Sequence, residues 1–379
     1  MSSILLTGLG TPNATILNVD FSGLTPGAAA SSIKGVSVAR TGAGATVQTG
    51  VPTVESGIAI NTPRIFSNGI YKGLLIEEAR TNLVTNPRAP QSAPWTGTGI
   101  TGNAYAGPDG SMLAARSQCA SGAPGSTPGP IVSVTGTTYA FSLWMAANSG
   151  TIDICSNLND GATINAPLFA NAVNTAWRFY KRTMLSGSVT GFLFSSEGRD
   201  LGAANPQGAE ARDQRIDMFM IEAGKFSTSF YDGTRGADIA SISSAAIVNP
   251  SGKLALNLEF YPLAALADYS GTVVPLFYID SNNNAYITIA TGKISVKLNG
   301  SVVTLPVALP TFAAFDAIKL FIECGTGVAT HAWISINGTI TDLGGGAGQA
   351  AVPTGGTFYL LNDTSAPFSC VVSKISSYL

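Results

Sequence analysis

The sequence is organised around one stretch, Gly73-Leu-Leu-Ile-Glu-Glu-Ala-Arg-Thr-Asn-Leu-Val-Thr-Asn86, the densest local signal in an otherwise apolar and glycine-rich chain. Its apolar run, Leu74 to Ile76, predicts a short buried strand. Four ionisable or amide side chains follow this run: Glu77, Glu78, Arg80 and Asn82. Asn86 and Pro87 then predict a turn into the next domain. We expect the stretch to join an extended N-terminal arm to a β-domain.

The composition favours a β-protein with little charge on its surface. Charged residues are 11% of the 379 residues, whereas globular domains usually have about 25%. The chain contains 43 glycines and 20 prolines without a Gly-X-Y period, so a collagen helix is excluded. Glycines between short runs of Val, Ile and Thr indicate turns between strands, and we predict an all-β fold.

The same composition excludes several classes of function. A net charge of −2 argues against nucleic-acid binding, which needs a basic face. No apolar run reaches the ~18 residues of a membrane span, and the N-terminus lacks a secretory signal. The sequence has four cysteines, Cys119, Cys155, Cys324 and Cys370. They are far apart and lack a zinc-ligand spacing, so we expect no metal and no cofactor. A soluble chain with so little charge is expected to bury surface in an oligomer.

The chain divides into three predicted parts: an arm over residues 1–72, a jelly roll over 73–238 and a second β-sandwich over 239–379. Alternation of apolar and polar residues predicts strands at Thr137 to Met145 and Lys253 to Tyr261, among others. Two Asn-Gly dipeptides, Asn299-Gly300 and Asn337-Gly338, are typical of two-residue hairpins. The glycine run from Gly344 to Gly348 is interpreted as a flexible loop.

A family resemblance adds to these inferences. The residues from Gly73 to Leu83 resemble a signature of bacteriophage virion proteins described as head fibres, tail fibres or minor structural proteins. The likeness continues at Pro108-Asp-Gly110, at Trp177-Arg178 and at Arg235-Gly-Ala-Asp238. It implies a carbohydrate-binding-module-like jelly roll followed by a concanavalin-A/laminin-G-like sandwich.

The resemblance also implies a function without catalysis. The chain would be a structural appendage of the virion, a homotrimer assembled in the host bacterial cytoplasm, whose N-terminal region attaches to capsid or tail proteins. Its lectin-like domains would contact host cell-surface glycan weakly and many times over. Two alternatives stay open: a capsid decoration or cement protein without a ligand, and a glycan-degrading tailspike.

The two glutamates of the opening stretch have two interpretations. Glu77 and Glu78 could be a glycosidase pair, but adjacent residues of an extended chain point to opposite faces, whereas catalysis needs two carboxyl groups facing one bond. The favoured interpretation is structural. Each glutamate would pair with Arg80, Arg64 or Arg88. The junction of arm and domain would then be fixed by four residues: Glu77, Glu78, Arg80 and Asn82.

Two tryptophans are the candidate carbohydrate-binding residues. Alternation places Trp144 and Trp333 opposite the apolar row of their strands, where an outward ring could stack on a sugar. The alternative is burial against another subunit or domain. His331 is the only histidine, and because no Gly-x-Ser-x-Gly motif accompanies it, a Ser-His-Asp triad is not indicated.

Overall fold

The computed structural model describes residues 15–29, 32–42, 45–50, 53–84, 86–88, 100–119, 134–149, 152–159, 166–173, 175–186, 193–199, 209–210, 212–269, 271–363 and 367–378. The regular structure of this part is β-strand, apart from two short 3-10 turns, η1 (Ser244–Ala246) and η2 (Leu266–Asp268). The all-β prediction is confirmed.

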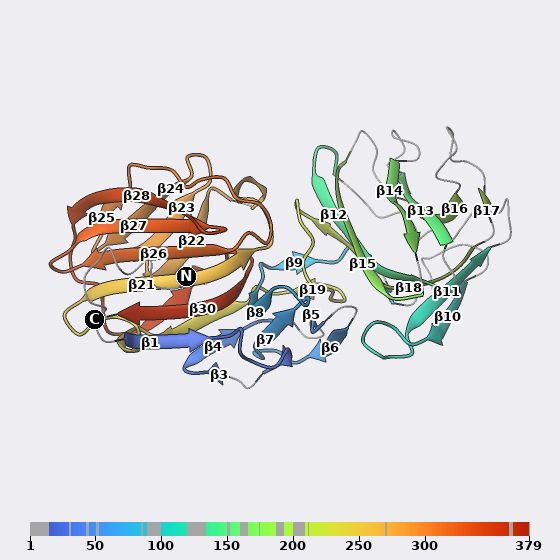
Figure 1. Cartoon of the computed structure of the whole chain (residues 1–379), viewed down its shortest axis with the longest axis horizontal. Coiled ribbons are helices and arrows are strands. Elements are labelled where there is room, and N and C mark those ends of the chain that lie inside the picture. Colours follow the sequence, from blue (N-terminus) through green and yellow to red (C-terminus); the bar gives the residue numbers. More distant parts are fainter. Residues whose placement is uncertain are drawn as a thin grey trace. The chain divides into compact units, whose positions relative to one another are not determined.

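The chain forms two compact units, which Figure 1 shows together. Unit 1 takes the segments up to Thr41, from Ala59 to Ala79, and from Gly236 onward, whereas unit 2 takes Gly42–Ile58 and Arg80–Arg235. The chain therefore passes between the units four times. Unit 2 consists of two insertions into the sequence of unit 1, which differs from the three consecutive parts expected from the sequence.

Unit 1 contains two large antiparallel sheets (Figure 1). The nine-stranded sheet has the order β2 (Gly27–Ala28), β7 (Arg64–Ser67), β8 (Lys72–Ile76), β30 (Cys370–Tyr378), β21 (Lys253–Pro262), β26 (Ile318–Gly325), β27 (Ala329–Ile336) and β28 (Thr339–Gly348), and β1 (Thr15–Asp20) also pairs with β30. The eight-stranded sheet has the order β25 (Ser301–Thr304), β24 (Lys293–Leu298), β23 (Asn283–Thr288), β22 (Val273–Asp280), β29 (Thr357–Leu360), β20 (Ile239–Ser243), β4 (Val36–Ala39) and β3 (Ser32–Ile33).

Local sequence chemistry accounts for much of unit 1. In β21 the alternate residues Leu254, Leu256 and Leu258 are completely buried, as the two-residue period of a strand requires. Asn299 and Asn337 have φ values of 47° and 50°, and each is followed by a glycine with positive φ. Both Asn-Gly hairpins are therefore confirmed, because a type I′ turn needs positive φ at both central residues.

Apart from β5 and β6, which belong to unit 2, the described strands near the N-terminus are part of the two large sheets of unit 1, which departs from the extended arm expected over residues 1–72. β1 pairs with β30, β4 pairs with β20, and β8 pairs with β30. A Cβ atom on Gly73 of β8 would lie 2.2 Å from the carbonyl oxygen of Val372 in β30. Gly73 is therefore needed for the close approach of two strands far apart in the sequence.

The described residues of unit 2 form four antiparallel sheets. A five-stranded sheet has the order β10 (Ile100–Tyr105), β11 (Ala114–Cys119), β18 (Arg212–Ala223), β12 (Thr138–Ala147) and β15 (Arg178–Leu185). A four-stranded sheet has the order β14 (Ala166–Val173), β13 (Ile152–Asn159), β16 (Leu193–Arg199) and β17 (Ala209–Glu210). The other two sheets are strand pairs, β5 (Ala45–Gln48) with β6 (Val54–Ile58), and β9 (Arg80–Thr81) with β19 (Thr234–Arg235).

The interior strand β12 of the five-stranded sheet packs on both of its faces. Tyr139, Phe141 and Leu143 belong to one hydrophobic cluster, and Trp144 and Ala146 belong to another. Both faces of the five-stranded sheet are thus covered within the unit, which explains why this strand is apolar at nearly every position.

Candidate functional site

Trp333 lies on the outer face of the nine-stranded sheet. Its neighbours in β27, Ala332 and Ile334, are buried, whereas Trp333 is only partly buried. The indole stacks on the ring of His331, with 3.9 Å between centroids and an interplanar angle of 6°. Phe321 of β26 packs beside it at a centroid distance of 5.6 Å. Trp333 is therefore opposite the apolar row of its strand, as the alternation predicted.

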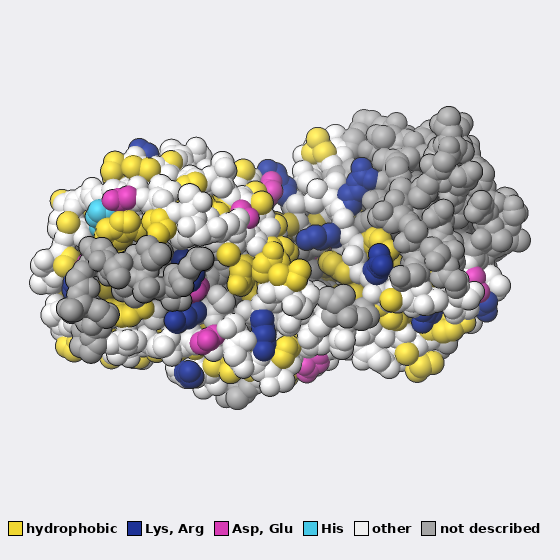
Figure 2. Space-filling view, in the orientation of Figure 1, with side chains coloured by type: hydrophobic (Ala, Val, Ile, Leu, Met, Phe, Trp, Pro, Cys, Tyr) yellow, Lys and Arg dark blue, Asp and Glu magenta, His cyan; other side chains and the backbone are white. Residues whose placement is uncertain are grey.

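Asp342 of β28 is held beside this aromatic stack. Nε2 of His331 lies 2.6 Å from Oδ1 of Asp342, and the backbone N–H of Gly344 donates to the same oxygen at 2.7 Å. The hydrogen bond with His331 is the largest influence on the pKa of Asp342, which lies below its ordinary value. The Asp342 side chain is 59% exposed, so its carboxylate can accept hydrogen bonds from a ligand. In Figure 2, histidine, acidic and hydrophobic side chains gather on this face, over β27 and β28.

The glycine run after Asp342 makes room for this arrangement. It belongs to β28, which corrects the expected flexible loop. Gly344 has a φ of 80° at a point where the pairing of β27 with β28 shifts register, a conformation that glycine adopts without strain. A Cβ atom on Gly345 would lie 3.1 Å from Nδ1 of His331. The glycines therefore allow the His331 ring to occupy its position.

Trp333 and Asp342 belong to a line of side chains that crosses the strands on this outer face. Directly paired residues of antiparallel strands place their side chains on the same face. The pairs run from β1 through β30, β21, β26, β27 and β28, and we call their six members the transverse row: Asn18, Ser376, Asn257, Phe321, Trp333 and Asp342. Both ends of the row are exposed, whereas Ser376 and Phe321 in its middle are 1% and 6% exposed.

Charged residues flank the transverse row and neutralise one another. The next line of paired residues has alternating signs: Asp20, Lys374, Glu259 and Lys319. Nζ of Lys319 lies 3.0 Å from Oε2 of Glu259. On the other flank, Nζ of Lys253 lies 2.7 Å from Oε1 of Glu323. The face therefore attracts no strongly charged ligand by long-range forces.

Trp144, the other candidate tryptophan, is buried in the core of unit 2. It is 4% exposed and packs in a cluster with Trp177, Met218 and Phe230. Trp144 does lie opposite the apolar row of β12, as predicted, but residues of its own unit cover that face. It therefore offers no surface for stacking on a sugar.

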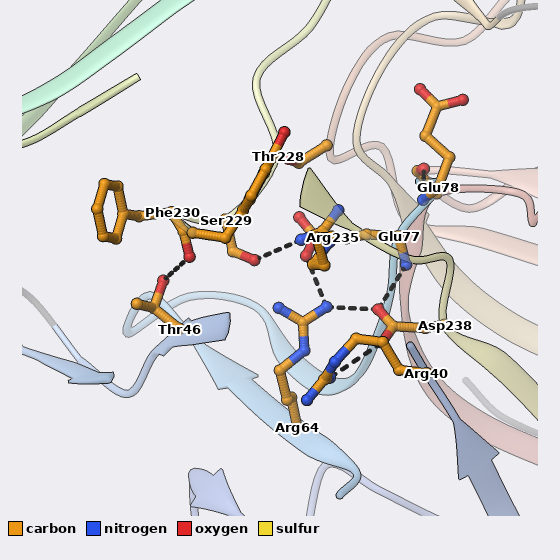
Figure 3. A network of polar contacts seen from close by, with 12 residues as sticks. Arg40, Thr46, Arg64, Glu77, Glu78, Thr228, Ser229, Phe230, Arg235 and Asp238 are labelled. Carbon is orange, nitrogen blue, oxygen red and sulfur yellow. Dashed lines mark hydrogen bonds and ion pairs between the residues drawn. The ribbon is translucent and has the colours of Figure 1, made fainter. Parts of the chain in front are cut away.

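Glu77 belongs to a group of four fully buried charged side chains, the buried ion cluster of unit 1 (Figure 3): Arg40, Arg64, Glu77 and Asp238. Nη2 of Arg64 donates to Oε2 of Glu77 at 2.7 Å and also to Oδ2 of Asp238. Nη1 of Arg40 donates to Oδ1 of Asp238 at 3.1 Å. Of the three arginines named as possible partners of the two glutamates, Arg64 is the one that pairs with Glu77.

Asp238 is the centre of the buried ion cluster. The backbone N–H of Glu77 donates to its Oδ2 at 3.0 Å, and Nη2 of Arg40 donates to the carbonyl of Ala59 at 2.7 Å. Burial by itself lowers the pKa of Arg64, but the charges of Asp238 and Glu77 outweigh it and raise that pKa. The cluster thus joins segments of unit 1 next to each passage of the chain into unit 2.

The other residues of the predicted junction are divided between the two units. Glu78 is 9% exposed, and its backbone N–H donates to Oγ of Ser369 at 2.9 Å within unit 1. Arg80 donates to the carbonyl of Ala223 within unit 2, and its guanidinium lies over the Phe226 ring, 5.1 Å from the centroid. Each residue therefore stabilises its own unit.

Asn82 bonds four backbone groups in the interior of unit 2. Its Nδ2 donates to the carbonyls of Phe219 and Tyr231, each at 3.2 Å. Its Oδ1 accepts from the N–H groups of Val84 and Ile221, each at 3.1 Å. Because buried backbone groups need partners, Asn82 is a structural residue rather than a ligand-binding one.

A buried carboxylate in unit 2, Glu222, was not singled out from the sequence. It accepts hydrogen bonds from Oγ1 of Thr228 at 2.6 Å and from the hydroxyl of Tyr231 at 2.9 Å. Burial raises the pKa values of both Glu222 and Tyr231. In the same unit, Arg235 donates to Oγ of Ser229 at 2.8 Å (Figure 3). These contacts give the segments around Glu222 and Arg235 structural roles.

Two other carboxylates of unit 2, those of Asp109 and Asp217, share one arginine. Nη1 of Arg88 donates to Oδ2 of Asp109 at 2.8 Å, and Nη2 donates to Oδ2 of Asp217 at 2.7 Å. Burial opposes the ionisation of Asp109, but hydrogen bonds from Arg88 outweigh it and lower its pKa, whereas burial raises the pKa of Asp217. The two side chains are 1% and 0% exposed. A glycosidic bond could not reach them, so the pair is structural.

The two cysteines whose side chains are described, Cys324 and Cys370, are buried. Burial raises the pKa of the Cys324 thiol to about 12, and it also raises that of Cys370, so neither thiol is poised as a nucleophile. The described part contains no group of three His, Cys, Asp or Glu side chains suited to a metal ion. None of its helices has the length and apolar character needed to cross a bilayer. Cys119 and Cys155 have side chains outside the described set.

Comparisons with known proteins add little. No family model and no curated protein sequence matches the chain. Among solved structures, it is similar to the N-terminal CBM22-1–CBM22-2 tandem domain from Paenibacillus barcinonensis Xyn10C. That alignment covers 79% of this chain and 99% of the other, with 11% identity and a TM-score of 0.28. A similarity this low carries no argument about fold or ligand, so the all-β assignment rests on the strands themselves.

Proposed function

We propose that this chain is a non-enzymatic appendage protein of a bacteriophage virion, a head or tail fibre, which contacts host cell-surface glycan through the outer face of the nine-stranded sheet. The observation that carries the binding role is the group of Trp333, His331 and Asp342, which places two stacked aromatic rings beside an exposed carboxylate on that face. The virion role is supported by the resemblance at Gly73 to Leu83 and at Arg235 to Asp238.

The exposed end of the transverse row has the chemistry that a sugar needs. The aromatic edge formed by Trp333 and His331 packs against the apolar C–H groups of a pyranose, and the carboxylate of Asp342 accepts hydrogen bonds from its hydroxyls. Because His331 and Gly344 already fix one oxygen of Asp342, little side-chain freedom is lost on binding.

We propose that such a site acts through multiple copies. A single exposed site of this kind binds weakly, and a homotrimer displayed many times on a particle increases the effective affinity. The partners are then sister copies, capsid or tail proteins bound by the N-terminal region, and host glycan. Assembly takes place in the host bacterial cytoplasm. Sedimentation of the purified chain tests the trimer, and antibody labelling of particles tests the location.

A non-enzymatic role agrees with the surroundings of the acidic side chains. Glu77 is committed to the buried ion cluster, Asp109 and Asp217 are committed to Arg88, and Glu222 is committed to Thr228 and Tyr231. The Asp342 carboxylate beside Trp333 faces His331 rather than a second carboxylate. The site therefore supports binding rather than hydrolysis.

The decisive experiment is a glycan array of bacterial surface polysaccharides, probed with the full chain and two variants. We expect binding by the wild type, loss of binding by Trp333→Ala, and retention by Tyr359→Ala, which removes a partly buried aromatic from the eight-stranded sheet. Absence of any wild-type signal would contradict the glycan role and favour a cement protein. Release of reducing sugar would instead favour a tailspike enzyme.

A further inference from the structure

One carboxylate oxygen of Asp342 is left open by the residues around it. Its Oδ1 lies 2.6 Å from Nε2 of His331 and accepts from the backbone N–H of Gly344. Because an ionised carboxylate only accepts hydrogen bonds, Nε2 of His331 carries the hydrogen. Within the described part of the chain, no donor is bonded to Oδ2, and the side chain is 59% exposed. Oδ2 is therefore available to a donor on a ligand.

The indole of Trp333 offers a donor beside this acceptor. Asp342 and Trp333 are directly paired residues of β28 and β27, so their side chains are neighbours on one face. Nε1 of Trp333 has no partner among the described residues, and it is not one of the buried polar atoms that lack a partner. The indole N–H therefore reaches solvent, and the site presents one donor and one anionic acceptor beside two stacked rings.

The charge of the site is negative. On β26, Glu323 is paired in register with His331, but Lys253 neutralises it at a distance of 2.7 Å. The pKa of Asp342 lies below its ordinary value, mainly because of the hydrogen bond with His331, so the carboxylate stays ionised near neutral pH. While His331 is unprotonated, Asp342 therefore gives the site one negative charge.

This chemistry discriminates between charged and uncharged sugars. An anionic sugar would be repelled by Asp342. A hydroxyl of a neutral sugar could donate to Oδ2, but a hydrogen bond between an ammonium group and a carboxylate is about twice as strong as a neutral one. The C–H groups of the same sugar ring would still pack against the aromatic rings of Trp333 and His331.

We propose that the Trp333–Asp342 site selects glycans whose sugars carry a free primary amino group, with the ammonium donating to Oδ2 of Asp342 and a ring hydroxyl accepting from Nε1 of Trp333. This inference rests on the proposed function, because it names the ligand class of the same site. The preferred ligands are polysaccharides with amino sugars that lack an N-acetyl group.

The test uses the glycan array in two forms, one untreated and one treated with aqueous acetic anhydride. The treatment converts free amino groups into neutral amides and retains the sugar rings. The strongest binder that carries amino groups is then titrated calorimetrically into the full chain, before and after N-acetylation, near neutral pH. We expect the amino form to bind about fivefold more tightly, as for an exposed ion pair, and added salt to reduce this ratio.

Two variants that each remove one negative charge separate a local effect from a general one. Asp342→Asn should reduce the ratio of the two affinities from about fivefold to about one. Asp20→Asn, at an exposed position of β1, is the matched control, because β1 lies five strands from β28 in the order of pairing. This control should leave the ratio unchanged.

The outcomes distinguish this inference from the function on which it rests. If the wild type binds amino and N-acetylated forms equally, or if Asp342→Asn leaves the ratio at its wild-type value, the ligand class is refuted and the glycan role survives. If an anionic polysaccharide binds most tightly, the ligand class is also refuted. If the wild type binds no polysaccharide in either form of the array, the proposed function itself fails.

Discussion

Unit 1 holds charged side chains in two contrasting settings. In the buried ion cluster, Arg64 and Asp238 have side chains with 0% exposure. On the outer face of the nine-stranded sheet, Lys319 and Glu259 also form an ion pair, but their side chains are 40% and 21% exposed. Ion pairing therefore stabilises the interior in one setting and balances surface charge in the other, and the degree of burial decides which role a pair has.

The difference separates the structural role of the buried charges from the binding role proposed for the outer face. A buried charge that loses its partner destabilises the fold strongly, whereas an exposed pair contributes little. The buried ion cluster therefore fixes the ends of the insertions in unit 1. The exposed pairs balance charge on the face that carries Trp333 and Asp342.

The largest expected effect follows from removal of the central charge of the buried ion cluster. Asp238→Asn keeps the shape of the side chain but leaves Arg40 and Arg64 with a single carboxylate between them. We expect a loss of about 3–5 kcal/mol of unfolding free energy, measured by chemical denaturation. A free energy of unfolding equal to that of the wild type would contradict the structural role of the buried ion cluster.

A smaller loss is expected from a backbone contact of the opening stretch. Gly73→Ala places a methyl group against the carbonyl of Val372, and such overpacking costs about 1–3 kcal/mol. Gly355→Ala is the control, because nothing lies within 4 Å of its added Cβ. Equal denaturation midpoints for the two variants would contradict the close approach of β8 to β30.

The exposed pair of the outer face should respond far less. Glu259→Gln removes the charge opposite Lys319, and we expect a change below about 1 kcal/mol in the free energy of unfolding. High salt should reduce even that difference. A loss as large as that of Asp238→Asn would remove the distinction between the two settings.

The smallest expected effect concerns pH. His331 lowers the pKa of Asp342 below its ordinary value of 3.8, so the folded state favours the ionised carboxylate. The resulting stabilisation is fully present above the unfolded-state pKa and disappears as the pH falls through the lower, folded-state pKa. Because Asp342 is 59% exposed, the contribution is small. NMR titration should show the Asp342 pKa rising in His331→Ala, and an unchanged pKa would exclude the hydrogen bond.

Local patterns explain which features could be predicted from the sequence. The hairpins at Asn299 and Asn337 and the buried residues of β21 depend on neighbouring residues alone, so turn chemistry and alternation were sufficient. For Glu77, the sequence narrowed the partner to three arginines, Arg80, Arg64 or Arg88, but it could not select Arg64, because that choice depends on how distant segments fold together. The outward position of Trp333 followed from the period of its strand.

Long-range pairing explains what could not be predicted. Asn18 joins the transverse row through Ser376, and Arg40 reaches Asp238, which is 198 residues away. No local pattern specifies such partners. Trp144 shows the same limit, because alternation gives the face on which a residue lies but not whether another part of the chain covers that face.

The central claim is that the buried charges maintain the fold whereas the outer face performs the binding. Its most direct test is the affinity of Trp333→Ala for the array polysaccharide, measured beside its unfolding free energy. The account predicts a loss of binding of about thirtyfold in a protein that still unfolds cooperatively near the wild-type midpoint. Undiminished binding by this folded variant would contradict it.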